Sequence, residues 1–505
     1  MGRTKMSQKN FVYSIVGRLV SMLTSFASRT VFVRVLSAEY LGLGGFFGNI
    51  FSIVSLCELG MGAAIAQSLY KPLAEEDEYR VSAIVAFYEK FCRLLSIVIA
   101  VLCTLAVPVL RGMVKTNLDF SLIISAYLIF VVHSVVSCLL TPKCTLVVCD
   151  QRLYVVTLVR SVFGVFALVL QSTMLIITGE YLLYLVSRIM VLTVEDIVIN
   201  RYADKNYPCL KLKSNVTKEY KKSLYNNVKA LVWHKVGGVL SRSTDSILLS
   251  CFVGLSGMGK YSNYALVIGT VGAFFDVAIN AVSASVGNLG ASDRGKKSEE
   301  IMRLMYFINF WLLTVGTSII VATLNPFIKL WLGEQMLFNN AEMLVIVSSF
   351  YFSCIRDPVQ IFVSTYGLFK ESRFLPVMRA IVNLVLSVIF MKKIGVAGVF
   401  LGTALSTVTV PLFGEVFVLY KHGFSLKCTS FCREMISYIS VSFLSAGGCF
   451  FLSEKFPENL SGIFARVFFS FCVSNIILLV FSSGKPYFSR MLCLVTGKVK
   501  KKIKF

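Results

Sequence analysis

Charged residues are scarce in this sequence. Only 15% of its 505 residues are charged, whereas 56% are hydrophobic and the mean hydropathy is +0.75. A soluble domain averages about a quarter charged residues, because it must cover its surface for water. The composition therefore excludes a soluble globular protein and indicates an integral membrane protein.

The sequence also lacks the residues and loops that would support catalysis. It has three histidines, and the longest segment between apolar runs, near 201–223, is too short for a catalytic or nucleotide-binding domain. The stretches "GASDRGKK" at 290–297 and "GLSGMGKY" at 254–261 approach a phosphate-binding loop but lack the Ser or Thr that follows its lysine. The fourteen cysteines are scattered through apolar segments, which is typical of structural thiols. We therefore expect a protein that is not an enzyme and that holds no metal ion or cofactor.

Long apolar runs fill most of the chain. About fourteen of them reach the roughly 20 residues that cross a hydrocarbon core as an α-helix. They lie near 11–35, 42–68, 83–110, 119–140, 153–178, 181–199, 224–253, 261–289, 303–325, 340–366, 373–391, 396–420, 434–453 and 461–483. The pattern predicts an all-α integral membrane protein with about fourteen transmembrane helices.

Basic residues are distributed unevenly between the loops. If the N-terminus is cytoplasmic and the spans alternate, the inside loops carry about thirty Lys and Arg and the outside loops about seven. This bias, together with the basic tail "KVKKKIKF", predicts that both termini are cytoplasmic. The net charge of +23 then reflects topology and attraction to anionic membrane lipids, and we expect no nucleic-acid partner.

Several cationic side chains lie inside the apolar runs, where each costs at least about 2.5–3.5 kcal/mol to insert and usually faces a cavity or a partner. Arg18, Ser25 and Arg29 form one stripe of the first run at helical spacing. Lys235 and Arg242, seven residues apart, share a face of the seventh run. Because guanidinium groups match phosphate oxygens with paired donors, this surplus of cations favours an anionic ligand. The predicted substrate-binding residues are Arg18, Arg29, Arg160, Lys235 and Arg242.

Carboxylates and their candidate partners form a second set of intramembrane residues. Protonation of Glu58 or Asp245 would be one way to couple substrate movement to an ion gradient. An alternative for Glu58 is a bond to a neighbouring backbone at "ELGMG", where glycines permit close helix approach. For two pairs of residues the alternative to a functional role is a structural ion pair: Arg188 with Glu195, and Arg356 with Asp357. The candidates for coupling or gating are Glu58, Asp245, Arg188, Glu195 and Asp276.

The two halves of the chain show a weak internal repeat. Val16-Gly17 corresponds to Val236-Gly237, and Phe32-Val33 to Phe252-Val253, at a constant shift. Transporters are often built from two related halves with the site between them. We expect two pseudo-symmetric six-helix lobes around a central cavity. The predicted division is an N-lobe over 1–200, a basic cytoplasmic loop over 201–223, a C-lobe over 224–420, and two extra helices with the basic tail over 421–505.

Three stretches carry a family resemblance. "RTVFVRVLSAEYLGLGGFFGNIFSIVSLCELGMGAAIAQSLYKPLAEED" resembles the N-terminal signature of Wzx-type polysaccharide flippases. "GKYSNYALVIGTVGAFFDVAINAVSASVGNL" resembles the start of their second half. "IRDPVQIFVSTYGLFKESRFLPVMRAIVNLVLSVIFMKKIGVAGVFLGTALSTV" resembles their spans 10–12. These flippases belong to the superfamily that also holds the MATE exporters and the lipid II flippase MurJ.

The resemblance implies a function in polysaccharide biosynthesis. Such a protein flips an undecaprenyl-diphosphate-linked oligosaccharide, a capsule or O-antigen unit, to the outer leaflet of the bacterial inner membrane by alternating access. H⁺ or Na⁺ would be the coupling ion, and polysaccharide polymerase machinery a further partner. Two alternatives stay open. One is a lipid II-type precursor flippase, whose substrate also carries diphosphate. The other is a MATE-like cation antiporter, which would need an acidic substrate cavity.

Overall fold

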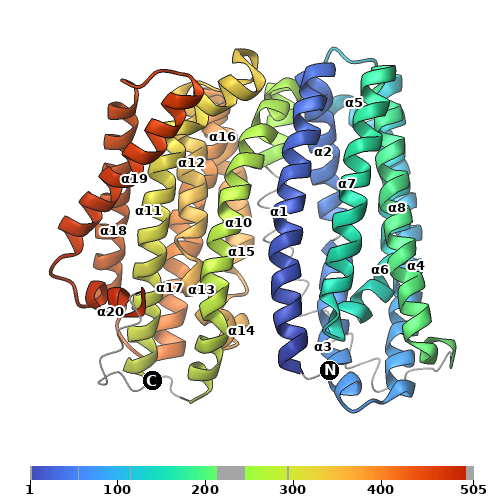
Figure 1. The fold of residues 1–505 in the computed structure, drawn as a ribbon, viewed down its shortest axis with the longest axis horizontal. Helices are drawn as coiled ribbons and strands as arrows, with labels where there is room; N and C mark the ends of the chain where they lie inside the picture. The colour runs from blue at the N-terminus through green and yellow to red at the C-terminus, as the bar shows by residue number, and fades with distance from the viewer. Residues whose placement is uncertain (1–2, 55, 114, 213–244, 293–294, 496–505) are drawn as a thin grey trace. The chain divides into compact units, whose positions relative to one another are not determined.

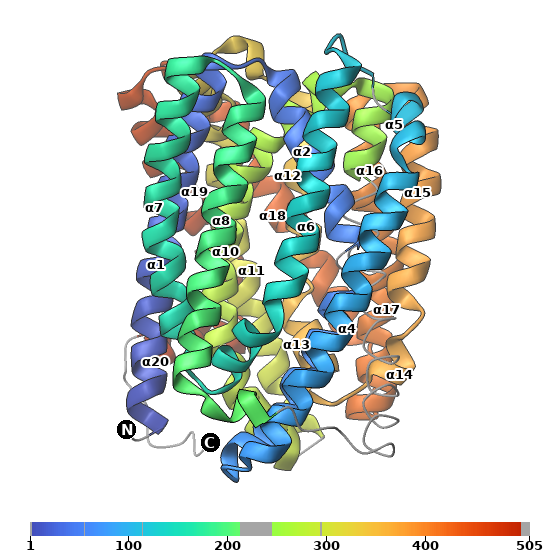
Figure 2. The same ribbon diagram turned by 90° about the vertical axis from the view of Figure 1, so that its right-hand side faces the viewer.

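The computed structural model describes residues 3–54, 56–113, 115–212, 245–292 and 295–495. Over these ranges the regular structure is helical and contains no strand, as Figures 1 and 2 show. The all-α fold predicted from the apolar runs is confirmed. Helices are the expected solution in lipid, because each satisfies its own backbone hydrogen bonds within one segment.

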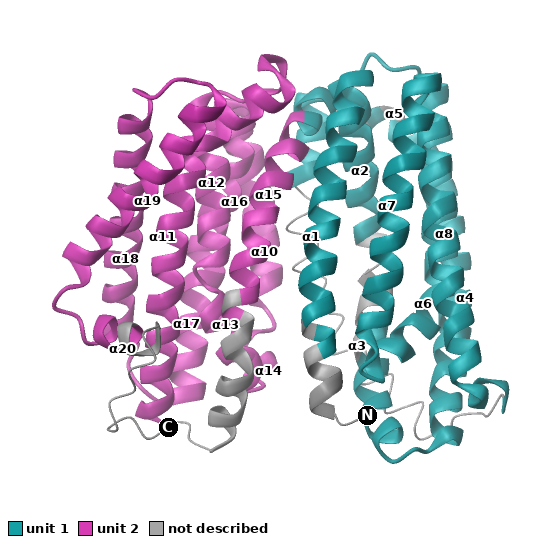
Figure 3. Cartoon of the chain, in the orientation of Figure 1, with its two compact units in different colours: residues 1–259 teal, residues 260–505 magenta. Residues whose placement is uncertain are grey.

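The chain forms two compact units, residues 1–259 and 260–505, which Figure 3 shows in different colours. The helices that lie wholly in unit 1 are α1 (Arg3–Val35), α2 (Ala38–Val54), α3 (Leu56–Ala74), α4 (Glu78–Leu105), α5 (Val107–Met113), α6 (Phe120–Cys149), α7 (Leu153–Thr178), α8 (Tyr181–Asn206), the 3₁₀ helix η1 (Pro208–Leu212) and the π-helix η2 (Leu249–Val253). Helix α10 (Leu255–Ser292) begins in unit 1 and continues into unit 2.

Unit 2 contains the remaining elements that the structure describes. Its helices are α11 (Lys296–Leu332), η3 (Glu334–Met336), α12 (Asn340–Cys354), α13 (Asp357–Thr365), α14 (Phe369–Ser372), α15 (Leu375–Ile394), α16 (Val396–Thr407), η4 (Val408–Leu412), α17 (Phe413–Val418), η5 (Leu419–Phe424), α18 (Thr429–Ser453), α19 (Leu460–Ser482) and α20 (Pro486–Val495).

Seven helical segments in the described ranges are long and apolar enough to cross a membrane. They are Phe120–Cys149, Leu153–Thr178, Lys296–Leu332, Phe369–Ile394, Val396–Phe424, Thr429–Ser453 and Leu460–Ser482. The chain is thus a multi-pass membrane protein, and the count of fourteen spans stays a prediction. Most of the run predicted near 224–253 lies outside the described residues, so the predicted division into lobes at 201–223 also stays a prediction.

Unit 1 is held together by close helix pairs. Helices α1 and α7 lie side by side in Figures 1 and 2, and a Cβ on Gly17 of α1 would collide with Thr157 of α7. Helices α2 and α6 share an aromatic core, in which Phe47 and Tyr127 lie 5.3 Å apart between ring centroids. Because lipid gives no hydrophobic drive for helix association, small residues that allow close contact carry much of the packing.

In unit 2, hydroxyl groups join α18 to the helices beside it. Thr314 of α11 and Ser442 of α18 share a hydrogen bond of 2.6 Å, and Tyr351 of α12 donates to the same serine at 2.9 Å. A turn further along, Ser318 and Ser445 lie 3.1 Å apart. These buried hydroxyls form a zipper between α11 and α18, and interhelical bonds of this kind are each worth roughly 0.6–2 kcal/mol in membranes.

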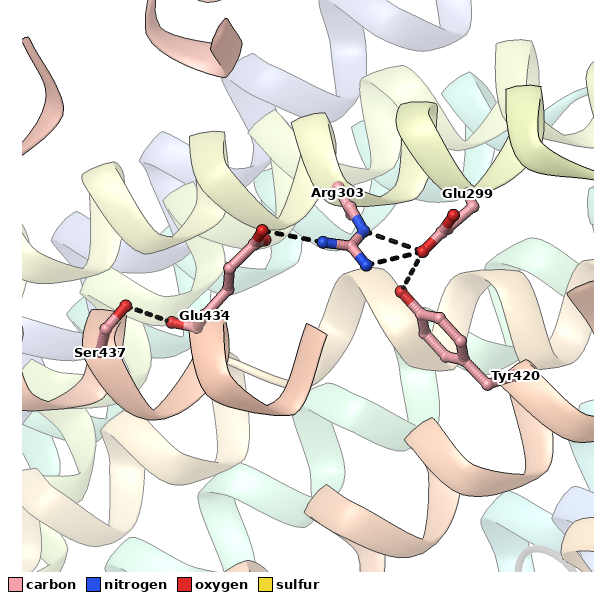
Figure 4. Close-up of polar contacts among 5 residues, drawn as sticks. All are labelled: Glu299, Arg303, Tyr420, Glu434 and Ser437. Carbon is pink, nitrogen blue, oxygen red and sulfur yellow. Dashed lines mark hydrogen bonds and ion pairs between the residues drawn. The ribbon is translucent and has the colours of Figure 1, made fainter. Parts of the chain in front are cut away.

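A buried arginine ties three elements together at one end of unit 2 (Figure 4). Arg303 of α11 donates to Glu299 of the same helix at 2.7 and 2.9 Å, and to Glu434 of α18 at 2.8 Å. Tyr420 of η5 donates to the Glu299 carboxylate at 2.9 Å. The Arg303 side chain is only 11% exposed. The guanidinium therefore bridges two carboxylates, and it fixes the start of α18 against α11.

Replacing Arg303 by glutamine should destabilise the protein strongly, because Glu299 and Glu434 would lose their shared cation. Breaking a buried pair in this way costs about 3–5 kcal/mol. Thermal unfolding of the purified protein in detergent measures the effect. The matched control is Arg490→Ala, which removes an exposed pair with Glu300 at 2.9 Å and should cost less than about 1 kcal/mol. Equal losses in the two variants would contradict the structural role of Arg303.

Candidate functional site

A cavity of about 300 Å³ lies inside unit 1 between three helices. Its lining residues come from α2 (Gly48, Phe51, Ser52), α6 (Phe130, His133, Ser134, Ser137) and α8 (Leu185, Arg188, Ile189, Leu192). On each helix these residues follow one another at steps of three and one positions, which is the pattern of a single helical face, so each helix turns one face toward the cavity. The volume is at the small end of the range of about 300–1,000 Å³ for ligand sites.

The cavity wall is polar and cationic. Arg188 is exposed, and it makes no hydrogen bond or ion pair with any described residue. The side chains of His133, Ser134 and Ser137 likewise have no hydrogen-bond partner within the described ranges. Ser52 donates to the Asn49 carbonyl at 2.7 Å. The cavity thus offers unused donors and a positive charge.

No carboxylate is among the residues that line this cavity. A second cation lies near it, since Arg29 of α1 is within electrostatic reach of Arg188 and of Tyr184 on α8. Two guanidinium groups that repel each other favour an anion between or beside them. The positive charge of the arrangement therefore suits an anionic group better than a cation.

The predicted cationic residues lie at different positions relative to the cavity. Arg29 is close to the cavity through Arg188, whereas Arg18 is exposed and lies eleven residues earlier on α1, roughly 16 Å along the helix axis. Arg160 of α7 is 58% exposed and pairs with Glu195 of α8 at 3.5 Å. Of these residues, only Arg29 has a described link to the cavity.

Two pairings suggested by sequence spacing are wrong. Glu195 pairs with Arg160 on the neighbouring helix and not with Arg188 on its own helix. Arg356 pairs with Glu415 of α17 through two bonds of 2.7 and 3.1 Å, and not with Asp357. In both cases the partner across the helix interface is better placed than the candidate on the same chain segment.

The remaining candidates fall into two groups. Asp245 is buried just before η2, and Asp276 is exposed on α10, within electrostatic reach of Asp357 on α13. Lys235 and Arg242 lie outside the described residues, as does the side chain of Glu58, so their predicted roles stay predictions.

Sequence reasoning missed most of the cavity wall. It gave no role to His133, Ser134, Ser137 or the phenylalanines that line the cavity. The signal was present in the spacing of residues 130, 133, 134 and 137, which repeats at helical period along one face of α6. Polar and aromatic residues alternate there with apolar ones, and only the position of α8 shows that this face meets a cavity.

Comparison with solved structures finds this fold in several membrane transporters. The lipid II flippase MurJ in an inward closed conformation aligns with a TM-score of 0.66 at 13% identity, over 94% of this chain and 98% of its own. An inward-facing multidrug resistance MATE family transporter of the MOP superfamily aligns with a TM-score of 0.65 at 13% identity, over 81% and 99%. The chain has the fold of the MOP transporters.

A further MOP superfamily transporter, from Pyrococcus furiosus, aligns with a TM-score of 0.58 at 11% identity, over 83% of this chain and 95% of its own. Its description attributes to it a binding pocket of reverse polarity and a different function. No protein-family model and no curated protein matches the sequence. At these identities the likeness establishes the MOP fold, while the polarity of the cavity must be judged from its own residues.

The positive potential of the cavity can be measured with a cysteine at Ser134. In Ser134→Cys, a methanethiosulfonate carrying a sulfonate should react several-fold faster than one carrying a trimethylammonium group, because Arg188 attracts the anion. Peptide mass spectrometry distinguishes the new thiol from the native ones. Adding Arg188→Gln should remove the difference. Equal rates in the single variant, or no reaction with either reagent, would contradict a water-accessible cationic cavity.

Proposed function

We propose that this protein is a flippase that moves an undecaprenyl-diphosphate-linked oligosaccharide from the cytoplasmic to the outer leaflet of a bacterial inner membrane. The observation that carries the proposal is Arg188, whose guanidinium faces a hydroxyl-lined cavity without a partner among the described residues. The MOP fold supports it, since both flippases and exporters are built on this fold.

The energetics of charge in a membrane support an anionic substrate. An arginine in a transmembrane segment costs at least about 2.5–3.5 kcal/mol unless a partner or water compensates it. A phosphate would supply that partner, because two of its oxygens match the parallel N–H groups of a guanidinium. The hydroxyls of Ser134 and Ser137 would complete its hydrogen bonding.

The alternative of a cation exporter has less support. A cationic drug would meet Arg188 and, nearby, Arg29, with no carboxylate lining the cavity to offset them. A precursor flippase of the lipid II type stays the second candidate. The MurJ comparison favours it, since it covers 94% of the chain against 81% for the MATE transporter.

Coupling to H⁺ or Na⁺ would use carboxylates away from the cavity. In unit 2, Asp276 and Asp357 are within electrostatic reach of each other, and Glu415 is held by Arg356. In unit 1, Glu195 is held by Arg160. We propose that these groups respond to the ion gradient while the cavity holds the headgroup, and that the polyprenyl tail stays in lipid. Alternating exposure of the cavity would then carry the headgroup between leaflets.

Transport into proteoliposomes tests the proposal. With a fluorescent undecaprenyl-diphosphate oligosaccharide, Arg188→Gln should lower the rate of transfer between leaflets by about tenfold or more, the loss expected for one charge-assisted contact. The matched control is Arg80→Gln, which removes an exposed arginine paired with Asp77 at 3.1 Å and should transport normally.

If the wild type and Arg188→Gln transfer the substrate at the same rate, Arg188 does not bind the anion. No transfer of any diphosphate-linked glycan, together with uptake of cationic dyes, would overturn the flippase proposal and favour a drug exporter.

A further inference from the structure

The cavity in unit 1 has an aromatic wall that an anion alone would not need. Phe51 of α2 and Phe130 of α6 both line it, and their rings are nearly parallel, with centroids 6.1 Å apart and planes 8° apart. We propose that this wall binds a single sugar ring, the one joined directly to the phosphate that Arg188 holds. This inference rests on the proposed function, and it names which part of the substrate the cavity recognises.

The aromatic wall is held rigidly by the core behind it. Phe51 is 7% exposed and packs 5.7 Å from the ring of Tyr127, while Phe130 packs 5.6 Å from Phe47. The Tyr127 hydroxyl is fixed in turn by donation to the Cys103 carbonyl at 2.9 Å. A ligand would therefore meet a preformed surface, which limits the ordering cost of binding.

The polar groups lie beside this wall, at distances that match the length of one sugar ring and its phosphate substituent. Ser134 and Ser137 follow Phe130 on the same face of α6, roughly 6 and 10 Å along the helix axis. His133 lies on that face too, and Arg188 reaches the cavity from α8. Phe130 and the hydroxyls thus bound one small space from α6, Phe51 bounds it from α2, and the guanidinium bounds it from α8.

A sugar 1-phosphate has the matching chemistry. One face of a pyranose presents C–H groups, which carry slight positive charge and pack well on the electron-rich face of an aromatic ring. Its hydroxyls both donate and accept, as do those of Ser134 and Ser137. Its phosphate would take the bidentate donors of Arg188. Since the volume is only about 300 Å³, the cavity would hold one sugar and leave the rest of a glycan outside.

Gly48 keeps the space beside Phe51 open. This glycine lies one turn before Ser52 on α2 and lines the cavity, and apart from its own helix backbone no described atom lies within 4 Å of where a Cβ would stand. A larger side chain there would extend into the cavity without striking the backbone. The position therefore allows the cavity to be filled while the charge of Arg188 is kept.

Binding to the purified full-length protein in detergent tests the subsite. The probes are inorganic phosphate, free glucose, and the 1-phosphates of glucose, galactose and N-acetylglucosamine, each titrated by calorimetry. We expect at least one sugar phosphate to bind about tenfold more tightly than inorganic phosphate, while free glucose binds weakly. Sugar phosphates that bind no more tightly than inorganic phosphate would overturn the subsite.

Three variants identify the residues responsible. Phe130→Leu should reduce the advantage of the sugar phosphate to about twofold or less without changing the affinity for inorganic phosphate, and Phe130→Tyr should keep the advantage. Gly48→Leu should exclude the sugar phosphate, whereas the control Gly269→Leu, at an equally open position on α10, should not. An unchanged advantage in both Phe130→Leu and Gly48→Leu would refute the inference.

The same titrations separate this inference from the proposed function. Inorganic phosphate that binds the wild type but not Arg188→Gln supports the anion site whatever the sugar does. If phosphate binds in this way and the sugar adds nothing, only the aromatic subsite fails. If no phosphate compound binds at all, the anion site fails and the subsite fails with it.

Discussion

The pairing of charge inside helices is the constraint on which the rest of this structure depends. A guanidinium in a membrane-spanning helix needs a partner, because lipid cannot solvate it. Arg303 meets Glu299 and Glu434, and Arg356 meets Glu415, each within 2.8 Å at the shortest contact. These partners join helices that are far apart in sequence. Arg188 is different, since its charge faces a cavity and not a carboxylate. The paired arginines stabilise the helices, and in the proposed function Arg188 holds the phosphate of the substrate.

Much of the fold could be predicted from hydrophobicity alone. The run predicted over 153–178 coincides with α7, which ends where Gly179 adopts a left-handed conformation with φ of 66°. The run predicted over 340–366 is instead two helices, since α12 ends at Cys354 and α13 begins at Asp357. Pro358 explains the break, because its ring suits a first helical turn and disfavours a helical interior. Apolar content predicts a span, and single residues decide where it ends.

The site could be predicted only in part, because the residues that pair with its side chains lie on neighbouring helices. Helical spacing correctly indicates that Arg188 and Glu195 share one side of α8, but Arg160 on α7 takes the carboxylate. A seven-residue spacing puts two groups about 10 Å apart along a helix, which is too far for a direct bond. Likewise, residues 130–137 show a polar and aromatic face without showing what it meets. Cations could be found from sequence, whereas their pairing requires the arrangement of the helices.

The hydroxyl zipper between α11 and α18 has a consequence for the surrounding bilayer. Thr314 with Ser442 and Ser318 with Ser445 are short, directional bonds that fix the two helices in register. Arg303 fixes the same pair near its end. Helices joined in this way cannot slide past each other when the hydrocarbon layer becomes thicker or thinner. They must tilt together. A mismatch between their length and the lipid thickness would therefore change the tilt of both helices as one rigid body, and not of each helix separately.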